Sequence, residues 1–75
     1  MTGPILQVAL PSPLRRLFDY RAPRGVGAAD LHIGQRVRVP FGKRAMVGLI
    51  AAISDHSEVP DNRLKPAEAL LDATP

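Results

Sequence analysis

Near the start of the chain a carboxylate stands between two aromatic residues, in Phe18-Asp19-Tyr20. Further along, arginine alternates with valine in a basic stretch that ends at a glycine, Arg36-Val-Arg-Val-Pro-Phe-Gly42. An aromatic ring can stack on a base, a carboxylate can accept hydrogen bonds from a hydroxyl group or a base edge, and cationic side chains can hold phosphate. We therefore predict a nucleic-acid site built from these two stretches.

The same residues also have plainer explanations. Phe18 and Tyr20 could belong to the core, because two Phe and one Tyr are all the aromatic residues of the chain. A charged Asp19 close to buried rings needs a partner, and a nearby arginine could supply it in a structural ion pair. Gly42 could serve a turn that requires positive φ, and the two roles are compatible because a glycine turn also lets a ligand approach closely.

The length of 75 residues limits the chain to one small domain, residues 1–75. The absence of cysteine excludes disulfide bonds, thiolate zinc sites and cysteine nucleophiles. His32 and His56 fall in different loops without a paired carboxylate motif, so we expect neither a metal site nor acid–base catalysis.

The apolar run at the N-terminus is broken by Gln7 and closed by Pro11. It is too short for a signal peptide or a membrane span. We therefore expect a cytoplasmic protein with no membrane partner.

The formal net charge of +3 is distributed unevenly along the chain. Residues 1–53 carry eight Arg or Lys against two Asp, a net charge of +6, whereas residues 54–75 carry two basic residues against five acidic ones, a net charge of −3. A basic portion of this kind fits a surface that meets an anionic polymer. An ordinary solvated surface is the alternative that charge alone leaves open.

Short runs of β-branched and aromatic residues, separated by Pro and Gly, predict a mainly β fold. The two-residue period of a strand places Asp19 on the opposite face from Phe18 and Tyr20. It also gives Arg36 and Arg38 a common outward face. Gly48, in an apolar strand, indicates a bulge or a close backbone approach. The expected strands are residues 5–10, 17–21, 35–40 and 46–53, with a loop at 21–30 and a turn at 41–44.

Residues 63–73 carry conflicting signals. Ala67-Glu-Ala-Leu-Leu-Asp favours a helix by propensity, and Pro66 is tolerable at its first position. On the residues alone, a short helix is the preferred interpretation of this segment.

An ordered set of motifs over essentially the whole chain resembles the N-terminal 3′ DNA-end-binding domain of PriA, the bacterial primosomal replication-restart helicase. The motifs are Leu10-Pro-x-Pro-Leu, Phe18-Asp-Tyr20, Gly34-x-Arg-Val-Arg-Val-Pro-Phe-Gly-Lys43, Gly48-Leu-Ile, Leu64-Lys65 and Leu71-Asp72-x-x-Pro. The resemblance implies a small, partly open barrel-like domain of about five or six short strands. It also implies that residues 65–71 form a strand, and we adopt that interpretation with a short helix as the alternative.

The resemblance further implies a role for particular residues. Asp19 would lie in a pocket for the terminal nucleotide, with Phe18 and Tyr20 shaping it and Gly42 and Lys65 completing it. Lys65 taken alone would be an ordinary solvated lysine. Arg36, Arg38 and Lys43 are expected to contact the phosphate backbone.

The chain departs from the full family pattern. It has no G-x-x-x-x-G-K-[ST] loop and no cysteine, so we expect no helicase activity and no catalytic residue here. ATP and zinc would belong to domains that this sequence lacks, and no cofactor is expected in the chain itself. Ala67 and Ala69 are smaller than the β-branched residues that a strand favours.

The function that we expect is recognition of the free 3′ end of nascent DNA at a stalled replication fork. The partner would be single-stranded or forked DNA with a free 3′ hydroxyl, bound by a monomer, with the remaining PriA domains and other primosome proteins as further partners. The competing interpretation is an SH3-like small barrel that binds a peptide or protein through its basic strand. Dependence of the affinity on a free 3′ hydroxyl separates the two.

Overall fold

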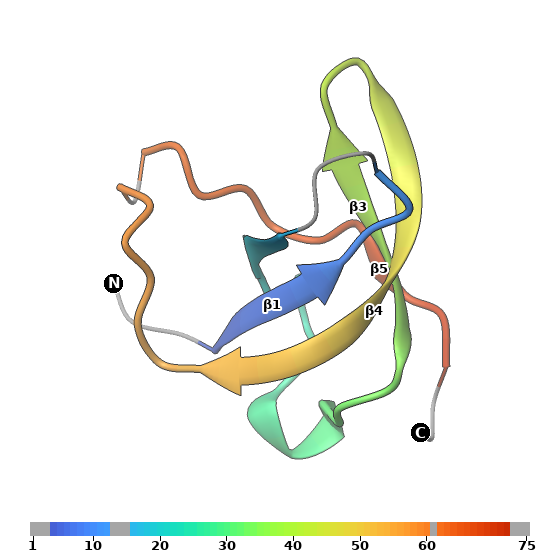
Figure 1. Cartoon of the computed structure of the whole chain (residues 1–75). Coiled ribbons are helices and arrows are strands. Elements are labelled where there is room, and N and C mark those ends of the chain that lie inside the picture. The colour runs from blue at the N-terminus through green and yellow to red at the C-terminus, as the bar shows by residue number, and fades with distance from the viewer. Residues whose placement is uncertain (1–3, 13–15, 61, 73–75) are drawn as a thin grey trace.

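The computed structural model describes residues 4–12, 16–60 and 62–72, and within them the chain forms one curved antiparallel sheet (Figure 1). Pro13, expected to end the first strand, and Arg15, one of the counted cations, lie outside the described residues. The strands lie in the order β2-β1-β4-β3-β5, and a short 3-10 helix, η1, precedes β3. The bounds are β1 Ile5–Ala9, β2 Leu17–Arg21, η1 Ala28–Asp30, β3 Arg36–Phe41, β4 Arg44–Ser54 and β5 Ala69–Leu70.

The long central strand β4 pairs with β3 through its first half and with β1 through its second half. The register between β1 and β4 shifts between Gln7 and Val8, and such a bulge lets a strand bend. Figure 1 shows β4 as a long curved band that joins the hairpin with β3 to the part of the sheet that contains β1.

Gly48 of β4 lies against the end of β1, with no room for a side chain. A Cβ atom at this position would stand 2.6 Å from the carbonyl oxygen of Ala9 and 2.6 Å from Cγ1 of Val8. Glycine is therefore required for this approach, which is one of the two roles that the sequence indicated for it.

The core lies on the concave face of the sheet, where alternate residues of each strand point inward. Leu6 and Val8 of β1, Val37 and Val39 of β3 and Ile50 of β4 are almost completely buried there. The buried core cluster consists of these five with Tyr20, Leu31 and Ala67.

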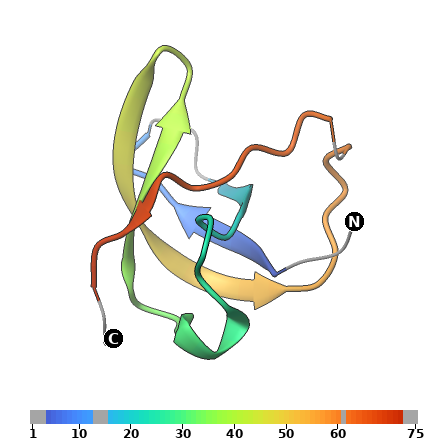
Figure 2. The ribbon, with the colours of Figure 1, turned by 180° about the vertical axis from the view of Figure 1, so that it is seen from behind.

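The segment between β4 and β5 returns past β2 before it reaches β3 (Figure 2). The backbone N–H of Arg21 donates to the carbonyl of Lys65 (2.9 Å), and the N–H of Ala67 donates to the carbonyl of Arg21 (2.8 Å). Arg21 and Pro66 form an isolated parallel bridge, after which β5 pairs with β3 through Leu70 and Val37. The two edges of the sheet meet at this bridge without a continuous ladder, so the sheet is not closed into a barrel.

A fully buried glutamine joins the loop before β3 to the residues after β5. Gln35 Oε1 accepts a hydrogen bond from the N–H of His32 (2.6 Å), and Gln35 Nε2 donates to the carbonyls of Asp30 and Asp72 (3.1 Å each). The side chain is 0% exposed, so these bonds replace the water that it loses on folding.

The mainly β fold is confirmed, with five strands in the described residues. The bounds of β2 agree with the sequence prediction, and those of β1, β3 and β4 differ by one or two residues at an end. The helix favoured by propensity over residues 63–73 is wrong, because β3 supplies a pairing partner that propensity does not register. The strand expected over 65–71 is shorter than predicted, with the bridge at Pro66 and a ladder at Ala69–Leu70.

Candidate nucleic-acid interface

Asp19 is half-buried on the convex side of β2, where its cross-strand neighbour is Gln7 of β1. Its Oδ2 accepts a hydrogen bond from the hydroxyl of Ser57 at 2.6 Å. This oxygen thus has a neutral hydroxyl group as a hydrogen-bond partner. An ionised carboxylate offers about four lone-pair sites, and the bond from Ser57 occupies one of them.

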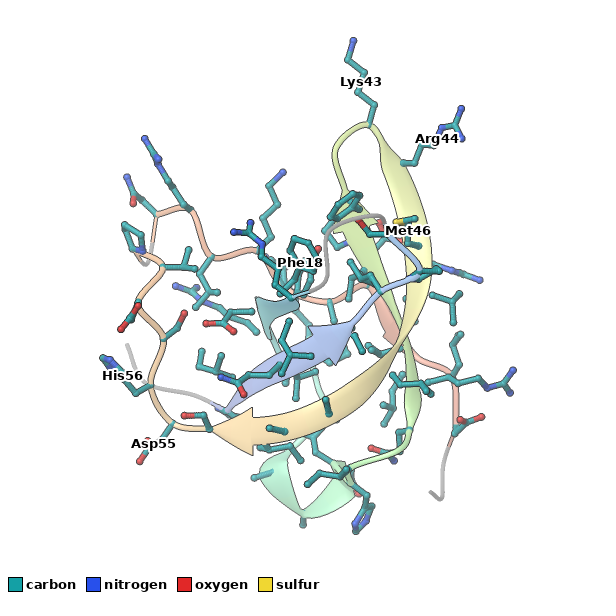
Figure 3. All side chains as sticks on the ribbon, in the orientation of Figure 1. Phe18, Lys43, Arg44, Met46, Asp55 and His56 are labelled. Carbon is teal, nitrogen blue, oxygen red and sulfur yellow. The ribbon has the colours of Figure 1, made fainter. Side chains whose placement is uncertain are left out.

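Phe18 faces the concave side of the sheet, on the opposite face of β2 from Asp19. Its ring packs edge to face against Phe41 with centroids 5.1 Å apart, and the guanidinium carbon of Arg16 lies 4.9 Å from its centroid. Phe18 is half-buried at the margin of the core, and Figure 3 shows it beside β3, between the tip of the β3–β4 hairpin and the body of the sheet. The arrangement offers a half-buried aromatic ring beside a cation.

Tyr20 is a core residue, 6% exposed. Its hydroxyl donates to the carbonyl of Pro40 at 2.7 Å, which ties β2 to β3 across the concave face. Burial raises the pKa of the phenol above its usual value. The buried ring does not present a face for stacking.

Gly42 forms the tip of the β3–β4 hairpin with Lys43, and its φ of +62° is a conformation that favours glycine. Figure 3 shows Lys43 and Arg44 extending from this tip away from the body of the sheet. Gly42 follows Phe41 directly, so the hairpin tip lies next to the Phe18–Phe41 pair.

Lys65 is exposed and is placed by its backbone, whose carbonyl accepts the bond from Arg21 N–H. Asp19 lies two residues before Arg21 on β2, so Ser57 and Lys65 attach the same returning segment to β2 at neighbouring points. In the described part of the chain, no hydrogen bond or ion pair joins Asp19, Gly42 and Lys65 directly to one another. The structure thus places Lys65 near Asp19 along β2, and Gly42 near Phe18.

Arg36 and Arg38 both point outward from β3, as the alternation predicted. Arg36 forms a two-pronged contact with Asp72, with its Nη2 at 2.9 Å from Oδ1 and its Nε at 3.2 Å from each carboxylate oxygen. These hydrogen bonds lower the pKa of Asp72 below its usual value and raise the pKa of Arg36. The charge of Arg36 is therefore partly balanced within the chain.

Ser57, Gln35, Phe41 and Asp72 contribute to this arrangement but were not selected from the sequence. The contact between Ser57 and Asp19 joins residues 38 positions apart, and Gln35 bonds to Asp72 across 37 positions. No local period marks such pairs. The signal for Phe41 was present, since it follows an alternating strand and precedes the turn glycine.

No helix in the described part of the chain is long and apolar enough to cross a membrane. Among residues 4–12, 16–60 and 62–72, no three His, Asp or Glu side chains are grouped so that they could hold a metal ion. The expected absence of a cofactor and the expected cytoplasmic location stay predictions.

Comparison with known proteins gives a consistent result. The chain is 45% identical over 71 residues to the replication restart protein PriA of Haemophilus influenzae, a match that covers 95% of this chain and 9% of that protein. It is 38% identical over 60 residues to the protein of the same name from Bacillus subtilis (80% of this chain, 7% of that protein). The corresponding protein of Buchnera aphidicola is 32% identical over 68 residues (91% and 9%).

The chain thus spans less than a tenth of the length of these relatives. A family model for the PriA 3′DNA-binding domain (3′BD) matches residues 7–75, which include every strand of the sheet except the first two residues of β1. The chain belongs to the family of PriA 3′ DNA-binding domains.

Proposed function

We propose that this domain binds the free 3′ end of a DNA strand, with the Asp19 carboxylate accepting a hydrogen bond from the terminal 3′ hydroxyl. The observation that carries the proposal is a half-buried carboxylate that is bonded to a neutral hydroxyl and retains acceptor capacity, in a chain of a 3′ DNA-binding family. A half-buried position strengthens such a bond relative to one in open water.

Discrimination between ends follows from the chemistry of the carboxylate. A 3′ hydroxyl can donate to Asp19, whereas a 3′ phosphate presents negative charge to a group that can only accept. A hydrogen bond to a charged group contributes about 1 to 3 kcal/mol, or roughly five- to 150-fold in Kd. We expect a preference for the hydroxyl end within that range.

Other residues supply binding that does not depend on the end. The half-buried ring of Phe18 is available to contact a base, while Lys65 and the exposed cations of β3 and the hairpin tip hold the phosphate backbone. In this arrangement Arg38 and Lys43 contribute more than Arg36, whose charge Asp72 partly balances.

In the cell, such a domain would recognise the nascent 3′ end at a stalled replication fork as part of a longer PriA-like protein. The names of the relatives support this role, since each is a replication restart protein. The remaining parts of that protein and other primosome components are the partners we propose, with the domain itself acting as a monomeric binding module without catalytic residues.

The decisive experiment compares oligonucleotides of one sequence that end in a 3′ hydroxyl or a 3′ phosphate, by fluorescence anisotropy at a fixed salt concentration. Tighter binding of the hydroxyl end is the expected result. Equal affinity for the two ends would reduce the activity to simple electrostatic binding, and tight binding of a peptide without any DNA dependence would favour a protein-interaction module.

Substitution of Asp19 separates recognition of the terminal hydroxyl from binding by background charge. Asp19→Ala should abolish most of the preference for the hydroxyl end while the circular dichroism spectrum is retained. Asp55→Ala is the matched control, because it removes the same charge from an exposed loop position near the end of β4 (Figure 3). An equal loss of preference in both variants would contradict a specific role for Asp19.

Lys65→Ala should weaken the binding of 3′ hydroxyl and 3′ phosphate oligonucleotides to a similar extent, because a contact with a backbone phosphate does not depend on the terminal group. With about two or three phosphate contacts, the log–log salt slope on single strands should be roughly −1.5 to −2, and each lost contact should reduce it by about 0.7. The double variant Arg36→Ala, Arg38→Ala should flatten the slope and keep the preference for the hydroxyl end. A steep slope with no dependence on a DNA end would show instead that the basic strand follows the backbone.

A further inference from the structure

The loop after β4 is built from two serine turns. Ser54 Oγ accepts a hydrogen bond from the N–H of His56 at 3.1 Å, and Ser57 Oγ accepts one from the N–H of Val59 at 3.0 Å. Hydroxyl groups of serine commonly fix turns in this way. The two turns are alike in type, but only that of Ser57 continues to β2.

The hydroxyl of Ser57 has its oxygen held by a backbone amide and its proton directed at Asp19. The Oγ to Oδ2 distance of 2.6 Å is in the short range of hydrogen bonds to a carboxylate. Val59, Ser57 and Asp19 thus form a chain of hydrogen bonds from the loop backbone to the candidate acceptor. Both side-chain partners are half-buried, so water competes with this bond less than it would at an exposed position.

A carboxylate on a strand can rotate about its side-chain bonds, and fixing it before a ligand arrives removes part of the ordering cost of binding. The bond from Ser57 engages Oδ2 and leaves Oδ1, together with the remaining lone pair of Oδ2, free of this donor. We infer that Ser57 is a positioning residue, which holds the Asp19 carboxylate in the orientation that receives the 3′ hydroxyl. This inference rests on the proposed function and adds to it a residue that acts through Asp19.

The opposite role would be obstruction, in which the loop covers Asp19 and must leave before DNA binds. The two roles predict opposite effects of removing the Ser57 hydroxyl on binding of the 3′ hydroxyl end. Loss of the Ser57 hydroxyl lowers the preference for the 3′ hydroxyl end if the residue positions Asp19, and raises the affinity for that end if the residue blocks it.

The test measures the ratio of affinities for 3′ hydroxyl and 3′ phosphate oligonucleotides in Ser57→Ala, with Ser54→Ala as the matched control. Ser54 is also half-buried and forms the same kind of turn, but its hydroxyl donates to the carbonyl of His56 and not to Asp19. We expect about a three- to tenfold fall in the ratio for Ser57→Ala, which corresponds to one hydrogen bond, and little change for Ser54→Ala.

A second pair of variants keeps the test valid if Ser57→Ala folds poorly. Ser57→Thr retains a hydroxyl and Ser57→Val replaces it with a methyl group of similar size, so a ratio near that of the unaltered protein is expected only for Thr. In the background of Asp19→Ala, Ser57→Ala should have no further effect, because the group that it positions is absent.

The outcomes test the role of Ser57 separately from the proposed recognition of the 3′ hydroxyl by Asp19. Equal binding of both ends by the unaltered protein would refute the proposed function and the role of Ser57 together. A clear preference that survives in both Ser57→Ala and Ser57→Val, or that increases in them, would overturn the role of Ser57 alone. If Ser54→Ala lowers the affinity ratio as much as Ser57→Ala does, the effect comes from the fold of the loop and the positioning role of Ser57 is refuted.

Discussion

Replacement of Gln35 by methionine removes the three hydrogen bonds of a fully buried side chain at nearly constant side-chain volume. The change leaves the N–H of His32 and the carbonyls of Asp30 and Asp72 without their present partner. Each unsatisfied buried group costs about 1 to 3 kcal/mol. His32 and Asp30 belong to an exposed loop, and water can replace part of what they lose.

We therefore expect Gln35→Met to lower the free energy of unfolding by about 2 to 4 kcal/mol. A domain of 75 residues has a total stability of about 4 to 11 kcal/mol, so the loss is a large fraction of it. The melting temperature should fall by roughly 10 to 25 °C.

Urea denaturation followed by circular dichroism measures this change directly, with a thermal melt as a second observable. Gln7→Met is the control, because it places the same substitution at a half-buried position on the convex face, and it should shift stability by no more than about 0.5 kcal/mol. A loss below about 1 kcal/mol in Gln35→Met would refute the reasoning, since water would then satisfy all three groups.

Three further predictions concern packing and ionisation. Gly48→Ala should cost about 1 to 3 kcal/mol in urea denaturation, because the new Cβ would meet β1 at 2.6 Å, and an unchanged stability would mean that β1 can shift at little cost. Tyr20, the one tyrosine in the chain, should form phenolate only at a pH above the usual tyrosine pKa of 10.0, and a spectrophotometric titration measures this. The burial of the neutral phenol stabilises the fold fully below pH 10.0, and this stabilisation is lost as the pH rises through the raised pKa. The pKa of Asp72 lies below its usual value near 3.8, so its contact with Arg36 stabilises the fold above about that pH and is lost as the pH falls through the lowered value. Arg36→Ala should accordingly flatten the acid side of the melting temperature plotted against pH, and a parallel curve would argue against the contact.

Strands β1 to β4 were predictable from the sequence because each carries its own alternation or apolar run. Alternation of buried and exposed residues in β3 placed Arg36 and Arg38 outward, and the apolar run around Gly48 gave β4. The extended form of Ala69 was not predictable from propensity, since a small residue becomes part of a strand only through its pairing with Arg38 of β3.

The candidate site was predictable in its residue types and less so in its geometry. The strand period separated Asp19 from Phe18, and the structure keeps them on opposite faces of β2. The burial of Tyr20 was one of two open alternatives, and the hydroxyl bond to Pro40 explains why it packs inward. Ser57 could not be found in advance, because its role depends on where a long loop returns in space.

The bridge between Arg21 and Pro66 has a consequence for how this domain opens. Proline has no N–H to donate, so in the described residues the backbone hydrogen bonds at this bridge are donated by the amides of Arg21 and Ala67. In hydrogen exchange, these two amides should lose protection through a local opening of the seam, at a lower free energy than the amides of the β3–β4 ladder. Such an opening moves Lys65 relative to β2 while the rest of the sheet stays folded, so the edge of the candidate interface can adjust to a DNA end on a faster timescale than global unfolding.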